Sequence, residues 1–185
     1  YKLNKTNQII TITGTNGKST TCKLLEKVFT RSNLKPELVG NIGKPILSVK
    51  KINKKTIFIV EASSYQLEYT KYFKSNHAAI LNISPDHLER HGTMKNYIIA
   101  KEKILKFQTS KDHCYLNLNN KLTKKIINRF KKKKLYSKLH QINNLEIKKI
   151  LKKIKNEYLL SENNLENISF VVKIAKNYKI KLKII

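Results

Sequence analysis

Apolar residues near the start of the chain follow two different periods in succession. Residues 8–13 (QIITIT) form a short β-branched run, which is typical of a buried strand. Residues 19–31 then place apolar side chains at the spacing of one helix face. The residues between these runs contain two glycines. The pattern therefore predicts a strand, a glycine-containing loop and a helix, in that order.

The rest of the chain continues this alternation. Further strands are predicted at residues 56–60, 78–83 and 113–118, and further helices at residues 94–107, 122–130 and 164–178. Residues 134–160 carry a weaker pattern, in which residues 141–147 are typical of small strands, and residues 181–185 resemble a strand. Because such alternation is typical of a parallel sheet covered on both faces, we expect an α/β fold. It would be a three-layer P-loop-type domain with a mostly parallel central sheet flanked by helices.

The length of 185 residues suits one domain with a substantial core, and 40% hydrophobic with 28% charged residues is a globular composition. The chain has no apolar run of the roughly 20 residues needed to cross a bilayer, and its start does not resemble a signal peptide. Cys22 and Cys114 stand far apart, in no metal-ligand spacing. We therefore expect a cytoplasmic protein with reduced thiols and no membrane partner.

The formal net charge of +27 raises the question of an anionic partner. Lysine is scattered over the whole length beside abundant Asn and Ile, as a general compositional bias would produce. The compact run at residues 131–134 has no interleaved aromatic residue of the kind that stacks on bases. A nucleic-acid binder remains an alternative, but we expect no nucleic-acid partner.

Three polar clusters follow predicted strands, where ligands gather in parallel α/β sheets. The first is TGTNGKST at residues 13–20, the second is Glu61 with two serines after it, and the third is Asp86 with His87. The loop glycines are separated by only two residues, whereas the usual P-loop spacing is four. Backbone N–H groups at a helix start nevertheless suit phosphate, and Lys18 adds a positive charge. We therefore expect ATP binding, with Glu61 as a carboxylate for Mg²⁺.

These strings, taken together, resemble the Mur ligases of peptidoglycan synthesis. The resemblance rests on TGTNGKST, GNIG at residues 40–43, EASSYQLE at residues 61–68, LNISPDHLERH at residues 81–91, and Ala100 with Lys101. Within the family, the E-x-S-S-[FY]-Q-L string is most similar to that of the members that add D-glutamate to UDP-N-acetylmuramoyl-L-alanine. The resemblance implies that ATP phosphorylates the substrate carboxylate to an acyl phosphate, which the amine of D-glutamate then attacks.

The resemblance also implies a role for each matching residue. The ATP-binding set would be Gly14, Thr15, Asn16, Gly17, Lys18, Ser19, Thr20, Asn164 and Asn167. Ser19 or Thr20 with Glu61 would hold a first Mg²⁺, and His87 would bind a second. Asn41, Ser63 and His87 would lie near the acyl-bearing substrate. Lys101 matches the lysine that the family carbamylates with CO₂, which would make it a metal ligand or an anion that sets the local charge.

The match is weaker downstream. Asn164 and Asn167 fit the family segment G-x-H-N-x-x-N, but Ser161 and Asn163 stand in place of its glycine and histidine. Without the resemblance, Asn164 would be interpreted as a cap of the last helix. His77, His113 and His140 are expected to be solvent or core residues, and His91 to support His87.

The resemblance assigns residues 1–185 to the central, ATP-binding domain of a three-domain ligase. The amino-terminal UDP-binding domain and the carboxy-terminal domain would then be absent from this chain, which begins with Tyr1 rather than Met. We expect a monomeric parent enzyme and little activity from the fragment. A sister Mur ligase, a folylpolyglutamate-type ligase and a non-catalytic ATP-binding module are the alternatives.

Overall fold

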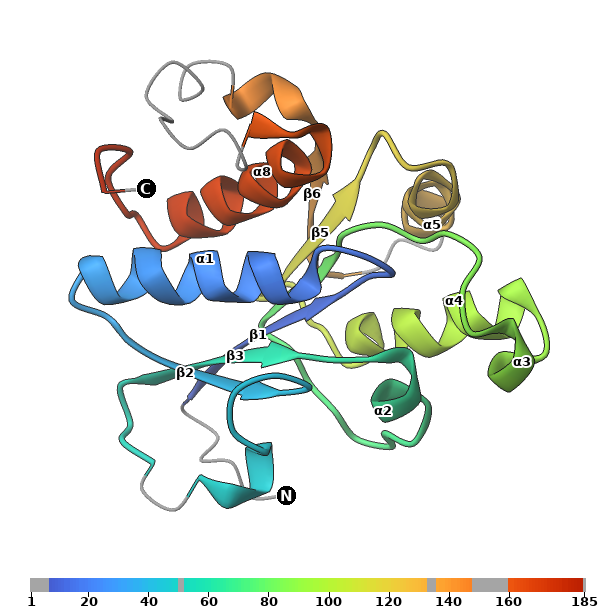
Figure 1. The fold of residues 1–185 in the computed structure, drawn as a ribbon, viewed down its shortest axis with the longest axis horizontal. Coiled ribbons are helices and arrows are strands. Elements are labelled where there is room, and N and C mark those ends of the chain that lie inside the picture. The colour runs from blue at the N-terminus through green and yellow to red at the C-terminus, as the bar shows by residue number, and fades with distance from the viewer. Residues whose placement is uncertain (1–6, 50–51, 133–135, 148–159, 185) are drawn as a thin grey trace.

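A parallel sheet forms the centre of the protein (Figure 1). The computed structural model describes residues 7–49, 52–132, 136–147 and 160–184, and within them the sheet has six strands. Their order across the sheet is β2 (Lys35–Gly40), β3 (Thr56–Glu61), β1 (Gln8–Thr13), β4 (His77–Ile80), β5 (His113–Asn117) and β6 (Lys138–Ile142). Every adjacent pair is parallel, so all carboxyl ends lie along one edge. The predicted α/β fold is confirmed.

Helices cover both faces of this sheet. On one face lie α1 (Lys18–Arg31) and α8 (Glu162–Asn177), and on the other lie α2 (Ser64–Glu68), α4 (Met94–Glu102) and α5 (Lys121–Lys132), as Figure 1 shows. The short helix α3 (Leu88–His91) precedes α4, and three 3₁₀ helices, η1 (Ile46–Ser48), η2 (Lys103–Leu105) and η3 (Asn144–Ile147), lie in the connections. No helix in the described ranges is long and apolar enough to cross a bilayer.

The two faces bury separate cores because side chains alternate along each strand. Ala79 and Leu81 pack with the residues of α1 and α8, whereas Ala78 and Ile80 pack with those of α4 and α5. All four are almost completely buried. The near-continuous apolar runs in the sequence therefore reflect strands that are covered on both sides.

Several short elements were not predicted from the sequence, among them β2, α2, α3 and η1. The strand β2 has the sequence KPELVG and lies at the edge of the sheet, where a proline is tolerated. The helix α2 has only five residues, too few to show a period. Several boundaries also differ: β4 ends at Ile80 rather than at residue 83, and α4 ends at Glu102 and continues as η2.

The carboxy-terminal part departs further from the prediction. The strand expected at residues 141–147 is instead β6, which ends at Ile142, followed by η3. The strand-like residues 182–184 form a turn. Residues 148–159 and 185, with the lysines at 133 and 134, lie outside the described residues.

Candidate active site

The predicted site residues of the first four strands converge on the carboxyl edge of the sheet. The loop after β1 contains Gly14 to Gly17, Glu61 is the last residue of β3, and Asn41 follows β2. The segment after β4 leads to Asp86 and His87. This is the edge at which open α/β sheets bind ligands.

The loop after β1 is held by the segment after β4. The backbone N–H of Thr15 donates to the carbonyl of Asn82 over 3.0 Å, and the N–H of Asn16 donates to Oδ1 of Asn82 over 2.8 Å. The loop ends at Gly17, whose φ of 81° is left-handed and which caps α1 without a side chain. The first turn of this 14-residue helix thus presents N–H groups that no capping side chain covers. Such a helix start favours an anion.

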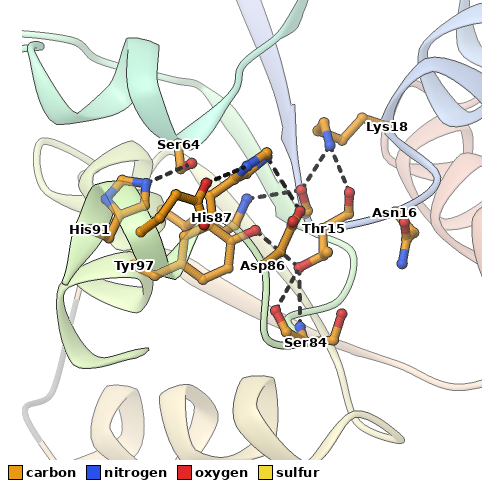
Figure 2. A network of polar contacts seen from close by, with 12 residues as sticks. Thr15, Asn16, Lys18, Ser64, Ser84, Asp86, His87, His91 and Tyr97 are labelled. Carbon is orange, nitrogen blue, oxygen red and sulfur yellow. Dashed lines mark hydrogen bonds and ion pairs between the residues drawn. The ribbon is translucent and has the colours of Figure 1, made fainter. Parts of the chain in front are cut away.

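Lys18 folds back over the same loop, as Figure 2 shows. Its Nζ donates to the carbonyl of Gly14 over 3.0 Å and to that of Thr15 over 2.8 Å. The ammonium group therefore lies within the loop that would surround a phosphate, and it can exchange these carbonyls for phosphate oxygens.

Glu61 is the buried acid of the site. Its side chain lies 1% exposed, yet both oxygens have donors: Ser19 Oγ donates to Oε2 over 2.8 Å, and Asn41 Nδ2 donates to Oε1 over 2.9 Å. Of the two candidate loop hydroxyls, that of Ser19 is the one bonded to Glu61, whereas Thr20 is half-buried next to it. The structure thus joins three predicted site residues from three different elements.

The close approach of β2 to Glu61 depends on Gly40, the first residue of the GNIG string, for which no role was predicted. A Cβ on Gly40 would lie 2.2 Å from the carbonyl oxygen of Glu61, and the φ of Gly40 is 108°. The next residue, Asn41, donates its N–H to that same carbonyl over 2.9 Å. Gly40 therefore allows Asn41 to contact Glu61 through both its backbone and its side chain.

Ser63 begins α2 through a capping box. Its Oγ accepts from the N–H of Gln66 over 3.3 Å, and Oε1 of Gln66 accepts from the N–H of Ser63 over 3.0 Å. The neighbouring Ser64 hydroxyl contacts Nε2 of His91 over 3.0 Å. Three residues of the S-S-Y-Q-L string, Ser63, Ser64 and Gln66, therefore stabilise the local structure at the start of α2. Ser63 also lies at the same edge of the sheet as Glu61.

His87 adopts a left-handed backbone conformation, with φ of 53°, which a residue other than glycine rarely adopts. Its Nε2 lies 3.3 Å from Oδ2 of Asp86, and its side chain is 42% exposed. The Tyr65 ring lies 4.9 Å from the His87 ring and stacks on the buried ring of His91 at 5.6 Å. Tyr65 therefore contacts both histidine rings, and the supporting role of His91 stays a prediction.

Lys101 is buried beneath the phosphate loop. It is 1% exposed, and its Nζ donates to the carbonyl of Gly14 over 2.8 Å and lies 4.5 Å from the centre of the Tyr97 ring. Burial, with the nearby charge of Lys18, lowers its pKa from 10.5 to about 7. Tyr97 also reaches the loop, since its hydroxyl lies 3.1 Å from Oγ1 of Thr15 (Figure 2). Tyr97 was not predicted, although it stands one helical turn before Lys101.

Asn164 and Asn167 lie on α8, against the loop after β1. Asn167 is 4% exposed, and its Oδ1 would lie 2.2 Å from a Cβ on Gly17. Its Nδ2 donates to Oδ1 of Asn164 over 3.3 Å. Ser161 occupies the position before α8 but makes no capping hydrogen bond with its side chain. Asn164 lies inside the first turn and is not the cap, and its Nδ2 donates to Oγ of Ser161 over 3.1 Å.

The other histidines form a separate cluster away from this edge. The rings of His77 and His113 stack at 4.7 Å, and His113 Nδ1 lies 2.9 Å from His140 Nε2. Within the described ranges, no three His, Cys, Asp or Glu side chains gather as a metal-binding group. Glu61, at the end of β3, and His87, at the start of α3, are therefore single candidate ligands and not members of one such group.

Comparisons with known proteins agree with this geometry. The family profile "Mur ligase middle domain" matches residues 12–185. The UDP-N-acetylmuramoylalanine--D-glutamate ligase of Clostridioides difficile (strain 630) is 36% identical over 199 residues, covering 100% of this chain and 44% of that protein. The protein of the same name from Elusimicrobium minutum (strain Pei191) is 45% identical over 121 residues, covering 62% of this chain and 27% of that protein.

Solved structures show the same fold. The crystal structure of MurF from Acinetobacter baumannii superimposes with a TM-score of 0.67 at 15% identity, covering 99% of this chain and 45% of that chain. This chain therefore spans less than half the length of the relatives named here. The match over residues 12–185 shows that the chain belongs to the Mur ligase family, as its middle domain.

Proposed function

We propose that this chain is the ATP-binding part of a ligase that adds D-glutamate to UDP-N-acetylmuramoyl-L-alanine through an acyl phosphate. The observation that carries the proposal is the buried carboxylate of Glu61, which accepts hydrogen bonds from Ser19, at the start of α1, and from Asn41, directly after β2. The names of the relatives supply the substrates. A carboxylate is a poor electrophile, and phosphorylation gives it a leaving group.

The triphosphate of ATP fits the loop from Gly14 to Thr20. The uncapped N–H groups of the first turn of α1 can each donate to a phosphate oxygen, and Lys18 can turn its ammonium group toward the same oxygens. Asn164 and Asn167, at the start of α8, lie on the flank of this loop. We assign the adenine side of the nucleotide to that flank.

The oxygen atoms of Ser19 and Glu61 fit a magnesium ion, which prefers oxygen ligands and keeps several waters. A second Mg²⁺ would lie near His87. The ions would neutralise charge between the phosphate and the substrate carboxylate. Asn41 and Ser63, at the neighbouring strand end, would contact the acyl-bearing substrate.

Carbamylation requires a neutral amine, and Lys101 can supply one. Its pKa of about 7 leaves a large neutral fraction at physiological pH. The neutral amine can attack CO₂ to form an N–C bond, and its proton leaves to solvent. The product would carry a negative charge on the side chain whose Nζ now donates to the carbonyl of Gly14. The repulsion between Lys101 and Lys18 would then become attraction. We propose this form for the active enzyme.

Residues 1–185 would be the central domain, with the UDP-binding and carboxy-terminal domains elsewhere in the parent protein. We propose a cytoplasmic, monomeric enzyme without a membrane or nucleic-acid partner for the reaction. The isolated chain would bind ATP with Mg²⁺ and form little amide.

The test measures phosphate release by the parent protein with ATP, UDP-N-acetylmuramoyl-L-alanine and D-glutamate. We expect turnover that requires all three and is lost in Lys18→Ala. Turnover with another amino acid in place of D-glutamate would identify a sister ligase. ATP binding without any amide product, and unchanged in Glu61→Ala, would identify a non-catalytic module.

A further inference from the structure

Two short segments that mix lysines with aromatic residues come together on the surface. They are KYFK at residues 71–74, before β4, and KILKF at residues 103–107, before β5. Together they enclose a pocket of about 420 Å³ whose walls include Lys71, Lys103, Lys106, Tyr72, Phe73 and Phe107. Both lining segments precede a strand in the sequence, β4 or β5, whereas the phosphate loop follows the strand β1. Glu61 and the phosphate loop do not line this pocket, but Lys71, Tyr72 and Phe73 also line a neighbouring cavity of about 790 Å³ that reaches Gly40 and Glu61.

The aromatic wall of this pocket is open to a ligand. Tyr72 is 89% exposed, although a large ring usually buries part of its surface. Its centre lies 6.2 Å from that of Phe107, with 39° between the planes. Nζ of Lys106 lies 5.3 Å from the centre of the Phe107 ring. The pocket thus combines the exposed ring of Tyr72 and the half-buried ring of Phe107 with ammonium groups at close range.

The positive charge of the pocket is not neutralised by nearby acids. Glu68 lies 3.9 Å from Arg90, and Glu102 pairs with Arg129 over 2.7 Å. Lys103 contacts the backbone carbonyl of Glu68 rather than its carboxylate. Among the residues that the structure describes, none of the three lysines of the pocket forms an ion pair, and no acid lines it. The site therefore favours an anion.

We propose that this pocket binds a nucleotide: an aromatic ring packs against Tyr72 and Phe107, and its phosphate contacts the ammonium groups of Lys71, Lys103 and Lys106. Stacking platforms beside lysines are the usual means of binding single nucleotides in a strand. The volume lies within the range of about 300–1,000 Å³ common for small-molecule sites. The observations that support this site do not depend on the proposed ligase reaction. The ligand is either a free nucleotide or one unit of a single-stranded nucleic acid.

The test is calorimetric titration of the chain with uridine 5′-monophosphate, uridine, inorganic phosphate and an eight-residue oligothymidylate. We expect saturable binding of the monophosphate that Lys18→Ala leaves unchanged. Tyr72→Ala should weaken it about tenfold, the scale of one stacking contact. Lys106→Gln should weaken it severalfold and reduce its dependence on salt.

Two matched variants control for general effects of these changes. Tyr136→Ala removes a ring that is 80% exposed outside the pocket, and Lys131→Gln removes an exposed charge at the end of α5. Neither should alter binding. Absence of saturable binding, an equal loss in the controls, or equal affinity for uridine or phosphate alone would overturn the proposal. Binding of the oligothymidylate tenfold more tightly than the monophosphate would identify single strands as the ligand, and equal affinity would identify a free nucleotide.

Discussion

Lys18 and Lys101 donate to the same carbonyl oxygen, that of Gly14, over 3.0 and 2.8 Å. One of these lysines is on α1 and the other on α4, so helices on opposite faces of the sheet meet at one peptide group. Two ammonium groups on one acceptor repel each other. This repulsion adds to burial in lowering the pKa of Lys101.

Replacing Lys101 with methionine should stabilise the fold while removing ligase activity from the parent enzyme. Because the folded state holds Lys101 at a pKa of about 7, against 10.5 for an exposed lysine, keeping the buried group charged costs free energy. The gain should be about 1 kcal/mol or more below pH 7 and should fall as the pH rises toward 10.5. Urea unfolding of both proteins at a series of pH values measures it. A gain that does not vary with pH would contradict the assignment, and Lys95→Met, on the same helix, is the control.

Replacing Gly17 with alanine should destabilise the loop. A Cβ would meet Oδ1 of Asn167 at 2.2 Å, and the φ of 81° is itself unfavourable for alanine. We expect a loss of about 1–3 kcal/mol in the free energy of unfolding. In the double variant with Asn167→Ala, part of this loss should be recovered, because the clash is removed and only the backbone strain remains. If the changes in unfolding free energy of the two single variants add up to that of the double variant, Gly17 and Asn167 do not interact.

Replacing Glu61 with glutamine should weaken the binding of ATP with Mg²⁺ by tenfold or more, because an amide is a poor magnesium ligand. The shape of the side chain and its contact with Ser19 are largely kept, so the unfolding midpoint should change little. Isothermal titration with ATP, in the presence and absence of Mg²⁺, separates the affinity that depends on the metal from the affinity for ATP alone. Glu37→Gln on β2, which changes a carboxylate paired with Lys44, should leave both affinities unchanged.

The histidine cluster should make the protein less stable in acid. Burial, with the neighbouring His113 and His140, lowers the pKa of His77 from 6.5 to about 3. Asp112 opposes this shift, and Tyr115 contacts His77 Nδ1 over 2.8 Å. The unfolded state therefore takes up a proton that the folded state does not, and stability is lost as the pH falls from 6.5 toward 3.

The variant His77→Phe isolates this effect. It removes the titrating group, so its free energy of unfolding should decline less steeply between pH 6.5 and 4 than that of the parent chain, whatever its absolute stability. Denaturant unfolding at several pH values gives both slopes. Equal slopes would assign the acid sensitivity to other groups.

The sequence predicted the parts of the fold that bury continuous apolar runs. The strands β1, β3 and β5 were expected because each is a short, nearly continuous apolar run, and the helices α1 and α8 because their apolar residues follow a helical period. The edge strand β2 was missed since proline and charge interrupt it, and α2 since its stability comes from a capping box and not from periodicity. Such elements depend on neighbours that no local pattern reveals.

The sequence also predicted only part of the candidate site. Strand ends and residue types were enough to select Lys18 and Glu61, and the family resemblance added Lys101. The pairing of Glu61 with both Ser19 and Asn41 depends on the strand order, which the sequence does not contain. The role of Asn82 in holding the loop was missed for the same reason.

The contacts at the start of α2 should affect which residues change together among Mur ligase sequences. Ser63 and Gln66 satisfy each other's backbone groups, while Ser64 reaches His91. A change at one member of either pair leaves a polar group without its partner. In a set of diverged sequences, we therefore expect Ser63 to covary with Gln66, and Ser64 with His91. The string that separates one kind of family member from its relatives would then record inherited pairs of contacts, rather than a direct choice of amino-acid substrate.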